Sequence, residues 1–542
     1  MKMKKIYNVS KKIGLSKKDL FLYGDYKAKV ISSSSSSKKG DVVLVTAITP
    51  TKYGEGKTTT AISLADSLNF LNKKAVLNLR EPSLGPYFGL KGGATGGGKN
   101  SIMPDEDINL HFNGDFHAIT SANNLIASCI DNEIYWGNKL NINPSTITFK
   151  RCIDMNDRCL RDISYKIRKD DQTTSSGFVI TAASEMMAIF CLAKDEEDFI
   201  SRVNDIIIGY TFDEKELYVK DLHISNAIRK LMHQALFPNL VQTGYNNPCL
   251  IHGGPFANIA CGCNSLISLT LAQKVADIVV TEAGFGADLG GEKFLDIIST
   301  IGNIKPKVAV LVVTIKALKY HGGEDESNLK GIDLDALEKG LPNMIRHVNN
   351  LRKYGIDVII NINKTPFDSK KEIDFLVDKC NKLGYMCAVN NSYEIGVKGG
   401  LDLANKVIDY LSSCKESSYH PLYNKELNIE QKIEIISKEI YGASKVEYSN
   451  QAIEDIKKIY RYNHQDYHVC MAKTPSSFSD DAKLINAPTD FTIHVNKVNL
   501  SNGAKLIVPV TNSVMLLPGL SKVPNAVLME NEKNDWFIRK KC

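Results

Sequence analysis

The stretch TAITPTKYGEGKTTTAISLADSL, residues Thr46 to Leu68, decides the fold predicted for this chain. It begins as an apolar strand, turns at Gly54 and Gly56, and continues as a helix. Glycine lets the backbone turn its N–H groups toward an anion, and the positive end of the following helix strengthens that attraction. Lys57 supplies a mobile positive charge, and the Thr58 hydroxyl is placed to ligate Mg²⁺. The order of strand, glycine turn and helix therefore predicts a phosphate-binding loop.

The formal phosphate-loop motif is broken at its first position. The pattern G-x-x-x-x-G-K-[ST] requires glycine where this chain has Thr51. The flanking strand and helix still favour phosphate binding, with an accidental glycine turn as the alternative. The residues predicted to contact the nucleotide are Thr51, Lys52, Tyr53, Gly54, Glu55, Gly56, Lys57 and Thr58.

A later tetrapeptide bears on the identity of the base. GTP-binding relatives of this loop usually carry N-K-x-D after a later strand, whereas this chain has Asn363-Lys364-Thr365-Pro366. Because the acidic residue that would receive the guanine amino group is missing, the predicted nucleotide is ATP.

Apolar β-branched runs recur along the chain, each followed by a turn and a helical stretch. Six runs are predicted as buried strands: Val42 to Ile48, Ala75 to Leu79, Cys249 to Ile251, Ile278 to Thr281, Val308 to Thr314 and Val358 to Ile362. Such alternation predicts an α/β protein with a mostly parallel sheet covered by helices on both faces. We expect one large phosphate-loop domain over residues 1–353 and two smaller domains, α/β over 354–445 and α+β over 446–542.

The bulk composition excludes several classes of protein. The 542 residues are 43% hydrophobic, and 67 basic against 61 acidic residues leave a net charge of +6, too dispersed to indicate nucleic acid. The 12 cysteines include no C-x-x-C pair, which favours free thiols in a reducing compartment. Neither a signal peptide nor a run of about 18 apolar residues is present, so we expect a cytoplasmic protein that does not enter a membrane.

Other strand ends carry residues suited to anion binding. One strand ends in Arg80-Glu81, and a guanidinium there can clamp a phosphoryl or carboxylate oxygen; a structural salt bridge between the two is the alternative. Leu84 to Gly98 contains seven glycines, and glycine turns also span His252 to Asn258 and Glu282 to Asp288. Such loops at the carboxyl edge of a sheet predict a site for an anionic intermediate, although glycine also serves plain tight turns.

The stretch DEDINLHFNGDFHAIT, Asp105 to Thr120, gathers several carboxylates and two histidines. A metal site, a proton-transfer site and a solvated loop are all compatible with this composition.

Taken together, these motifs resemble those of the formate–tetrahydrofolate ligase family. The matching stretches are LYGDYKAKV (Leu22 to Val30), PTKYGEGKTTT, LREPSLGPYFGLKGGATGGG, EDINLHFNGDFHAITSANNL, DMNDR, HGGPFANIA, TEAGFGADLG, LKYHGG, VCMAKT, FSDD and LPGLSKVP. They span essentially the whole chain. No dehydrogenase or cyclohydrolase segment precedes them, so the resemblance is to the monofunctional bacterial type.

The resemblance implies a two-step reaction. ATP phosphorylates formate to formyl phosphate, and N10 of tetrahydrofolate then attacks the formyl carbon. Lys57 and Arg80 are the implied catalytic residues, and the implied substrate-binding residues are Arg80, Glu81, Asp115, Gly254, Thr365 and Tyr393. The resemblance further implies Mg²⁺, activation by ammonium or potassium, a homotetramer, and a folate site to which residues 354–445 contribute.

The departures from the family pattern gather in the part expected to hold the pterin. Thr365 stands where the family usually has phenylalanine and Tyr393 where it usually has tryptophan, with Phe367 as a candidate substitute. Since aromatic contacts contribute about 0.5–1.5 kcal/mol beyond burial, we expect folate binding to be weaker by about tenfold. Cys261 replaces a common histidine, and Ile395 to Gly400 differs from the family's K-G-G-E-G-G.

Two other functions stay open at this point. A phosphate-loop ATPase that switches a partner protein would hydrolyse ATP without formate or folate, and it would leave the glycine-rich Leu84 to Gly98 without a purpose. A drifted relative would still bind ATP but would have lost its selectivity for folate.

Overall fold

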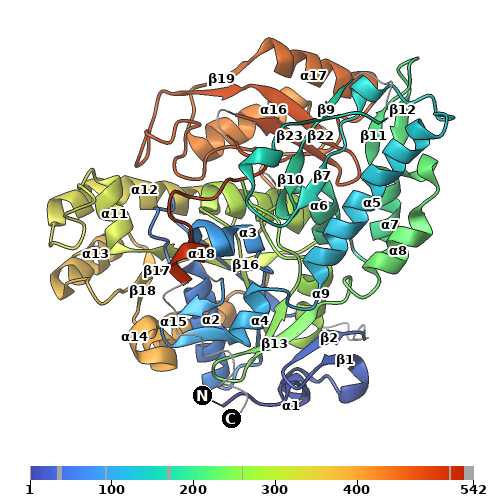
Figure 1. Cartoon of the computed structure of the whole chain (residues 1–542). Coiled ribbons are helices and arrows are strands. Elements are labelled where there is room, and N and C mark those ends of the chain that lie inside the picture. The colour runs from blue at the N-terminus through green and yellow to red at the C-terminus, as the bar shows by residue number, and fades with distance from the viewer. Residues whose placement is uncertain are drawn as a thin grey trace.

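One large sheet organises the molecule (Figure 1). The computed structural model describes residues 2–32, 39–91, 94–167, 173–258, 260–511 and 514–529. In sheet order the strands are β1 (Leu20–Tyr23), β2 (Lys27–Val30), β13 (Asn239–Thr243), β14 (Pro248–Ile251), β4 (Ala75–Leu79), β15 (Ile278–Glu282), β3 (Asp41–Ala47), β16 (Pro306–Val313), β17 (Asp357–Asn363) and β18 (Met386–Asn390). Strand β6 (Asn100–Met103) pairs with β13 and with β5 (Gly96–Gly97).

The strands from β14 to β18 all pair in parallel. All six strands predicted from the sequence lie in this run, so the predicted parallel sheet is confirmed. Strands β1, β2 and β13 add an antiparallel edge. Because parallel strands point the same way, the loops that leave their carboxyl ends meet along one edge of the sheet.

Both faces of the sheet are buried, as a mostly parallel sheet requires. Side chains alternate along β3, so Val42 and Leu44 belong to one apolar core and Val43 and Val45 to the other. Helices α9 (Leu266–Val275) and α12 (Leu334–Arg352) contribute to the first core, and helices α2 (Lys57–Phe70) and α15 (Leu401–Ser413) to the second.

Two further groups of helices lie at the two sides of the main body (Figure 1). One group comprises α5 (Asp115–Tyr135), α6 (Glu185–Leu192), α7 (Glu196–Asn204) and α8 (Ser225–Met232). The other comprises α11 (Ile315–His321) and α13 (Lys370–Lys382). Among the helices of the described ranges, none combines the length and the apolar character needed to cross a membrane.

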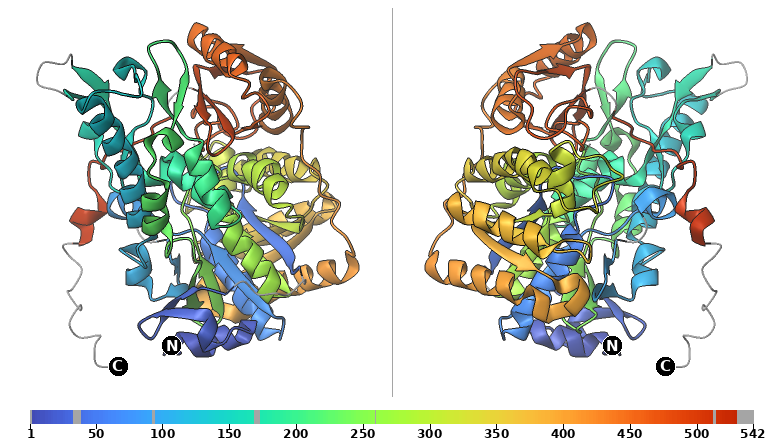
Figure 2. Two further views of the ribbon diagram at one scale, coloured as in Figure 1. Left: turned by 90° about the vertical axis from the view of Figure 1, so that its right-hand side faces the viewer. Right: turned by 90° about the vertical axis from the view of Figure 1, so that its left-hand side faces the viewer.

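The C-terminal part of the chain packs on one side of this body (Figure 2). Its elements are α16 (Ile429–Ile435), β19 (Lys445–Tyr448), α17 (Asn450–Arg461), β20 (His468–Val469), β21 (Thr492–Val495), β22 (Lys497–Ser501) and β23 (Leu506–Val510). They form two small sheets, β19-β21 and β20-β23-β22. The chain then returns to the main body, where Asn525 at the start of α18 (Asn525–Leu528) donates to the Tyr87 carbonyl at 3.1 Å.

The division of the chain at residues 353 and 445 stays a prediction. The main sheet runs across the first of these positions, because β17 and β18 are its last two strands. The folate loops expected in residues 354–445 are therefore built on the same sheet as the phosphate loop.

Candidate active site

The loop between β3 and α2 has the conformation that its glycines predict. Gly54 and Gly56 have φ angles of 75° and 76°, in the left-handed region that other residues rarely adopt. Helix α2 begins at Lys57, directly after Gly56. The predicted sequence of strand, glycine turn and helix start is confirmed.

Glu55 closes this loop and explains why Thr51 can replace a glycine. The buried Glu55 carboxylate accepts hydrogen bonds from the Thr51 N–H at 2.8 Å and from the Thr51 hydroxyl at 2.9 Å. Its other oxygen accepts from the Thr314 hydroxyl at 2.6 Å, beside the end of β16. Thr51 is not among the residues with a positive φ angle, so glycine is not needed at that position.

Asn363 holds the opposite side of the loop from the end of β17. Its side-chain amide donates to the Glu55 carbonyl at 3.0 Å. A Cβ atom added to Gly56 would overlap the same amide nitrogen. Glycine is therefore required at position 56 both by the φ angle and by the close approach of Asn363. Asn363 is the first residue of the tetrapeptide Asn363-Lys364-Thr365-Pro366, from which ATP was predicted as the nucleotide.

Lys57 and Thr58, the first residues of α2, face a carboxylate from the neighbouring strand. The Thr58 hydroxyl donates to Glu282 at 2.8 Å, and Glu282 is the last residue of β15. Burial lowers the pKa of Lys57, while the carboxylates of Glu282 and Glu55 oppose that shift. Glu282 was predicted only as the first residue of a glycine turn and not as a site residue in its own right, although a carboxylate that ends an apolar strand was the available signal.

Arg80, which follows β4, approaches Glu282 from the other side. Its guanidinium lies 3.9 Å from Glu282 and donates to the Pro255 carbonyl at 3.1 Å. Within the described ranges its ion pair is thus with Glu282, and the alternative of a salt bridge with Glu81 is wrong. A Cβ atom on Gly284 would lie 2.9 Å from the guanidinium, so the glycine turn after β15 packs directly against Arg80.

Glu81 and Asp115 form a buried cluster with Lys29. The Lys29 ammonium bonds to the Asp115 carboxylate, which also accepts from the Asn239 amide at 2.7 Å. Burial raises the pKa of Glu81 well above its usual range, and the negative charge of Asp115 adds to this rise. The side-chain hydrogen bond between Glu81 and Asp115 raises the pKa of Glu81 further, and it opposes the burial that raises the pKa of Asp115.

The composition of the stretch Asp105 to Thr120 is compatible with a metal site, a proton-transfer site or a solvated loop. No group of three histidine, cysteine or carboxylate side chains in the described part of the chain could hold a metal ion. Asp115 is tied to Lys29 at the start of α5, and Asp107 pairs with Lys27 at 2.8 Å. The structure therefore gives no support to the metal alternative.

A cavity of about 350 Å³ opens between these strand ends. Four of the predicted residues line it: Thr58, Arg80, Glu81 and Gly254. Phe256, Asn258 and Phe285 also line it, and they belong to the two glycine turns predicted to form a site for an anionic intermediate. Asn156, Met515 and Pro518 line it as well and were not among the predicted site residues. Met515 and Pro518 come from the returning C-terminal segment; Pro518 lies in the LPGLSKVP motif, and Met515 lies two residues before that motif begins.

Thr365 and Tyr393 lie outside this cavity, as a second group on the far side of the phosphate loop. They follow β17 and β18, which are parallel neighbours, and the Lys364–Glu394 ion pair of 3.2 Å joins the two loops. Tyr393 is 46% exposed, and a Cβ atom on Gly97 would lie 3.4 Å from its ring. This exposed ring therefore borders the glycine-rich stretch, of which Gly92 and Gly93 lie outside the described residues.

Phe367, the candidate substitute for a missing pterin ring, is 66% exposed. The Lys330 ammonium lies 4.9 Å from the centroid of its ring. Phe367 follows Thr365 in the same loop, so an aromatic face is present close to the position where the family usually has phenylalanine.

This arrangement defines an α/β protein of the phosphate-loop class, with a guanidinium and a carboxylate beside the loop at the carboxyl edge of a parallel sheet. Comparison with known proteins identifies the family. A family model described as formate–tetrahydrofolate ligase matches residues 1–537. A formate–tetrahydrofolate ligase of Caldicellulosiruptor saccharolyticus is 47% identical over 529 residues, which cover 96% of this chain and 95% of that protein. The chain belongs to the formate–tetrahydrofolate ligase family.

The two glycines of the loop provide a matched test of its geometry. Both have left-handed φ angles, but a Cβ atom on Gly54 would meet no atom within 4 Å, whereas one on Gly56 would meet Asn363. A left-handed alanine costs about 1–2 kcal/mol, so Gly54→Ala should weaken Mg·ADP binding about tenfold. Gly56→Ala should weaken it at least about 100-fold, because the overlap adds to the strain. Calorimetric titration measures both, and equal losses would contradict the role given to Asn363.

Proposed function

We propose that this chain catalyses the ATP-dependent ligation of formate to tetrahydrofolate, giving 10-formyltetrahydrofolate, ADP and phosphate. The observation that carries the proposal is the convergence of Thr58, Glu282 and Arg80, which all line one cavity beside the phosphate loop. Membership of the formate–tetrahydrofolate ligase family supports the same reaction.

The chemistry requires activation of formate, because its carboxylate has no leaving group. Transfer of the γ-phosphoryl group from ATP to a formate oxygen gives formyl phosphate and ADP, and attack by N10 of tetrahydrofolate then expels phosphate. Phosphoryl transfer is catalysed chiefly by positioning and by neutralising charge on the transferring oxygens. Lys57 and Arg80, on either side of Glu282, are placed to do this from the loop and from β4.

The walls of the cavity suit a reactive mixed anhydride. Phe256, Phe285 and Met515 line it together with Arg80. Such apolar side chains would limit the access of water, which would otherwise hydrolyse formyl phosphate. By this proposal Glu81 and Gly254 border the formyl phosphate, and Asp115 acts on it through Glu81.

The residues at the start of α2 fit a magnesium ion. Mg²⁺ prefers oxygen ligands, and it is commonly held by a phosphate-loop hydroxyl and a carboxylate from a neighbouring strand. Thr58 and Glu282 are such a pair, with their oxygens 2.8 Å apart. The ion would neutralise charge on the nucleotide phosphates. Activation by ammonium or potassium and a homotetrameric assembly are further proposals, drawn from the family.

Glu282→Gln tests the magnesium ligands. Loss of the carboxylate charge should raise the Mg²⁺ concentration for half-maximal activity at least about tenfold, since a neutral amide is a poor ligand for this ion. Glu326→Gln is the control, because Glu326 is an exposed carboxylate that pairs with Lys52 outside the cavity. An unchanged Mg²⁺ requirement in Glu282→Gln would remove Glu282 from the metal site.

Release of ADP by the purified protein tests the function as a whole. It should require formate, tetrahydrofolate and Mg²⁺ together and should accompany formation of 10-formyltetrahydrofolate. Lys57→Ala and Arg80→Ala should each lower turnover at least about 100-fold, because each removes charge stabilisation from the transferring oxygens. Lys73→Ala, an exposed lysine beyond the far end of α2, is the control. Release indifferent to formate and folate would instead favour the switch ATPase.

Tyr393 tests the folate side of the proposal. We place the pterin against Tyr393 and Thr365, where Tyr393→Trp should restore stacking area and lower the KM for tetrahydrofolate by about two- to tenfold. The KM values for ATP and formate should not change. Tyr385→Trp is the control, because Tyr385 precedes β18 and so lies at the opposite edge of the sheet. An unchanged folate KM in Tyr393→Trp would place the pterin elsewhere.

A further inference from the structure

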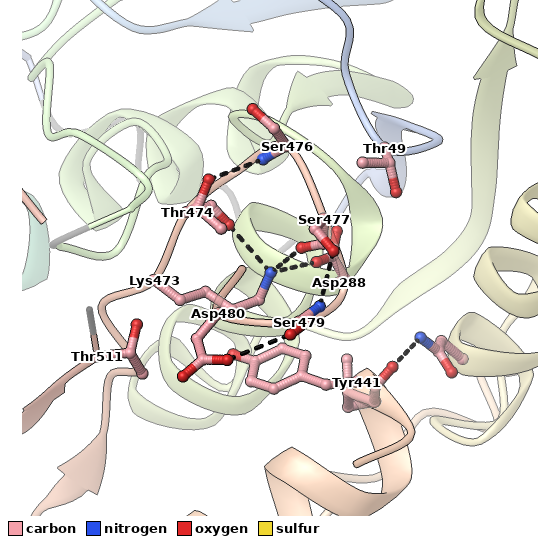
Figure 3. A network of polar contacts seen from close by, with 12 residues as sticks. Thr49, Asp288, Tyr441, Lys473, Thr474, Ser476, Ser477, Ser479, Asp480 and Thr511 are labelled. Atoms are coloured by element: carbon pink, nitrogen blue, oxygen red, sulfur yellow. Dashed lines mark hydrogen bonds and ion pairs between the residues drawn. The ribbon is translucent and has the colours of Figure 1, made fainter. Parts of the chain in front are cut away.

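Lys473 is a fully buried lysine whose ammonium is enclosed by polar groups (Figure 3). Its Nζ lies 3.0 Å from the Asp288 carboxylate and donates to the carbonyls of Thr474, at 3.1 Å, and Ser477. The same nitrogen is 4.8 Å from the centroid of the Tyr441 ring. Removing a charge from water is costly unless the charged group keeps its hydrogen-bond and ion-pair partners. These partners therefore fix the position of the Lys473 ammonium.

The residue before Lys473 is fixed in the C-terminal part of the chain. Ala472 donates its N–H to the Pro509 carbonyl at 2.8 Å, and its own carbonyl accepts from the Thr511 N–H at 3.0 Å. Lys473 therefore leaves a sheet of the C-terminal part and extends its side chain into the main body.

Asp288, the partner of Lys473, belongs to the glycine turn after β15. A Cβ atom on Gly286 would lie 2.5 Å from the Asp288 carboxylate, which shows that this carboxylate packs against the backbone of the turn. In the same turn Gly284 packs against Arg80, and Phe285 lines the cavity. The ion pair therefore supports one wall of the proposed active site.

The segment that follows Lys473 also reaches the base of the phosphate loop. The Phe478 ring lies 4.6 Å from the His347 ring, and His347 Nε2 is 3.0 Å from the hydroxyl of Thr49, two residues before the loop. The Asn486 N–H donates to His321 Nδ1 at 3.2 Å. Because Nδ1 accepts, the proton of a neutral His321 is on Nε2, which donates to the Thr49 carbonyl at 3.0 Å. Two contacts from residues 473–486 thus converge on Thr49.

We propose that Lys473 is a positioning residue for the ligase reaction. Its ion pair with Asp288 docks residues 473–486 against both the glycine turn beside Arg80 and the base of the phosphate loop. The C-terminal part thereby sets the spacing between the phosphate loop and Arg80. The turnover measurement that tests this inference rests on the proposed function. The binding measurement requires only that the protein bind the nucleotide.

Lys432 provides a matched control. It is also fully buried, and its ammonium donates to the carbonyls of Gln465 and Tyr467, both at 3.1 Å. These partners all belong to the C-terminal part and lie away from the phosphate loop. A buried lysine that is merely structural and one that positions the active site can therefore be compared within the same chain.

The experiment compares Lys473→Met with Lys432→Met at a temperature where circular dichroism shows both to be folded. Both variants should unfold at lower temperature than the unmodified protein. Lys473→Met should lower kcat at least tenfold and weaken Mg·ADP binding at least fivefold by calorimetry, while Lys432→Met should keep both within twofold. Equal effects in the two variants, or an unchanged kcat in Lys473→Met, would overturn the proposal.

A second variant covers the case in which Lys473→Met does not fold. Asp288→Asn keeps the shape of the partner but removes its charge, and it should show the same losses of kcat and Mg·ADP affinity; wild-type values would overturn the proposal. If the unmodified protein formed no 10-formyltetrahydrofolate, the proposed function would fail. The Mg·ADP affinities of Asp288→Asn and Lys432→Met would still decide the role of Lys473.

Discussion

Parallel pairing of β4, β15 and β3 is the constraint on which the rest of the site depends. Their hydrogen-bonded register brings the three carboxyl ends side by side, so that Arg80, Glu282 and the phosphate loop become neighbours. Glu282 is more than 200 positions from both Thr58 and Arg80 in the sequence, yet its carboxylate accepts a hydrogen bond from Thr58 at 2.8 Å and lies 3.9 Å from Arg80. A charge-dense site of this kind follows from the sheet, because each strand end delivers one group to a common edge.

Along the edge of the same sheet, two groups of residues of different chemical character lie on either side of the phosphate loop. On one side of the phosphate loop, the ends of β14, β4 and β15 enclose a cavity with a guanidinium and carboxylates. On the other side, the ends of β17 and β18 present Thr365 and the half-exposed Tyr393. The loop itself is held from both sides, by Glu282 at Thr58 and by Asn363 at the Glu55 carbonyl. The C-terminal part completes this support through its ion pair with Asp288 and through its contacts with His347 and His321, which in turn bond to Thr49.

Local patterns were sufficient for six strands of the parallel sheet and for the phosphate loop, but not for the partners of the side chains. The strands were predictable because β-branched runs bounded by turns describe buried parallel strands, and the loop was predictable because its glycines adopt left-handed φ angles. Arg80 was predicted as an anion ligand, but the alternative of a salt bridge with Glu81 was wrong, because the Arg80 guanidinium lies beside Glu282 while the Glu81 carboxyl group is buried beside Asp115 and Lys29. Glu282 was missed as its partner, since only strand order places it beside Arg80.

By itself, the sequence determined the parallel α/β class, the phosphate loop and, through its motifs, the family. These features depend on short-range periodicity, on glycine at defined spacings and on motifs that lie within single segments. Only the tertiary structure decided that Glu55 compensates for Thr51, that Met515 lines the cavity, and that Lys473 is paired with Asp288. Each of these contacts depends on the distance and orientation of side chains brought together by folding. Spacing along the chain does not specify either quantity, because packing of the sheets and helices sets both.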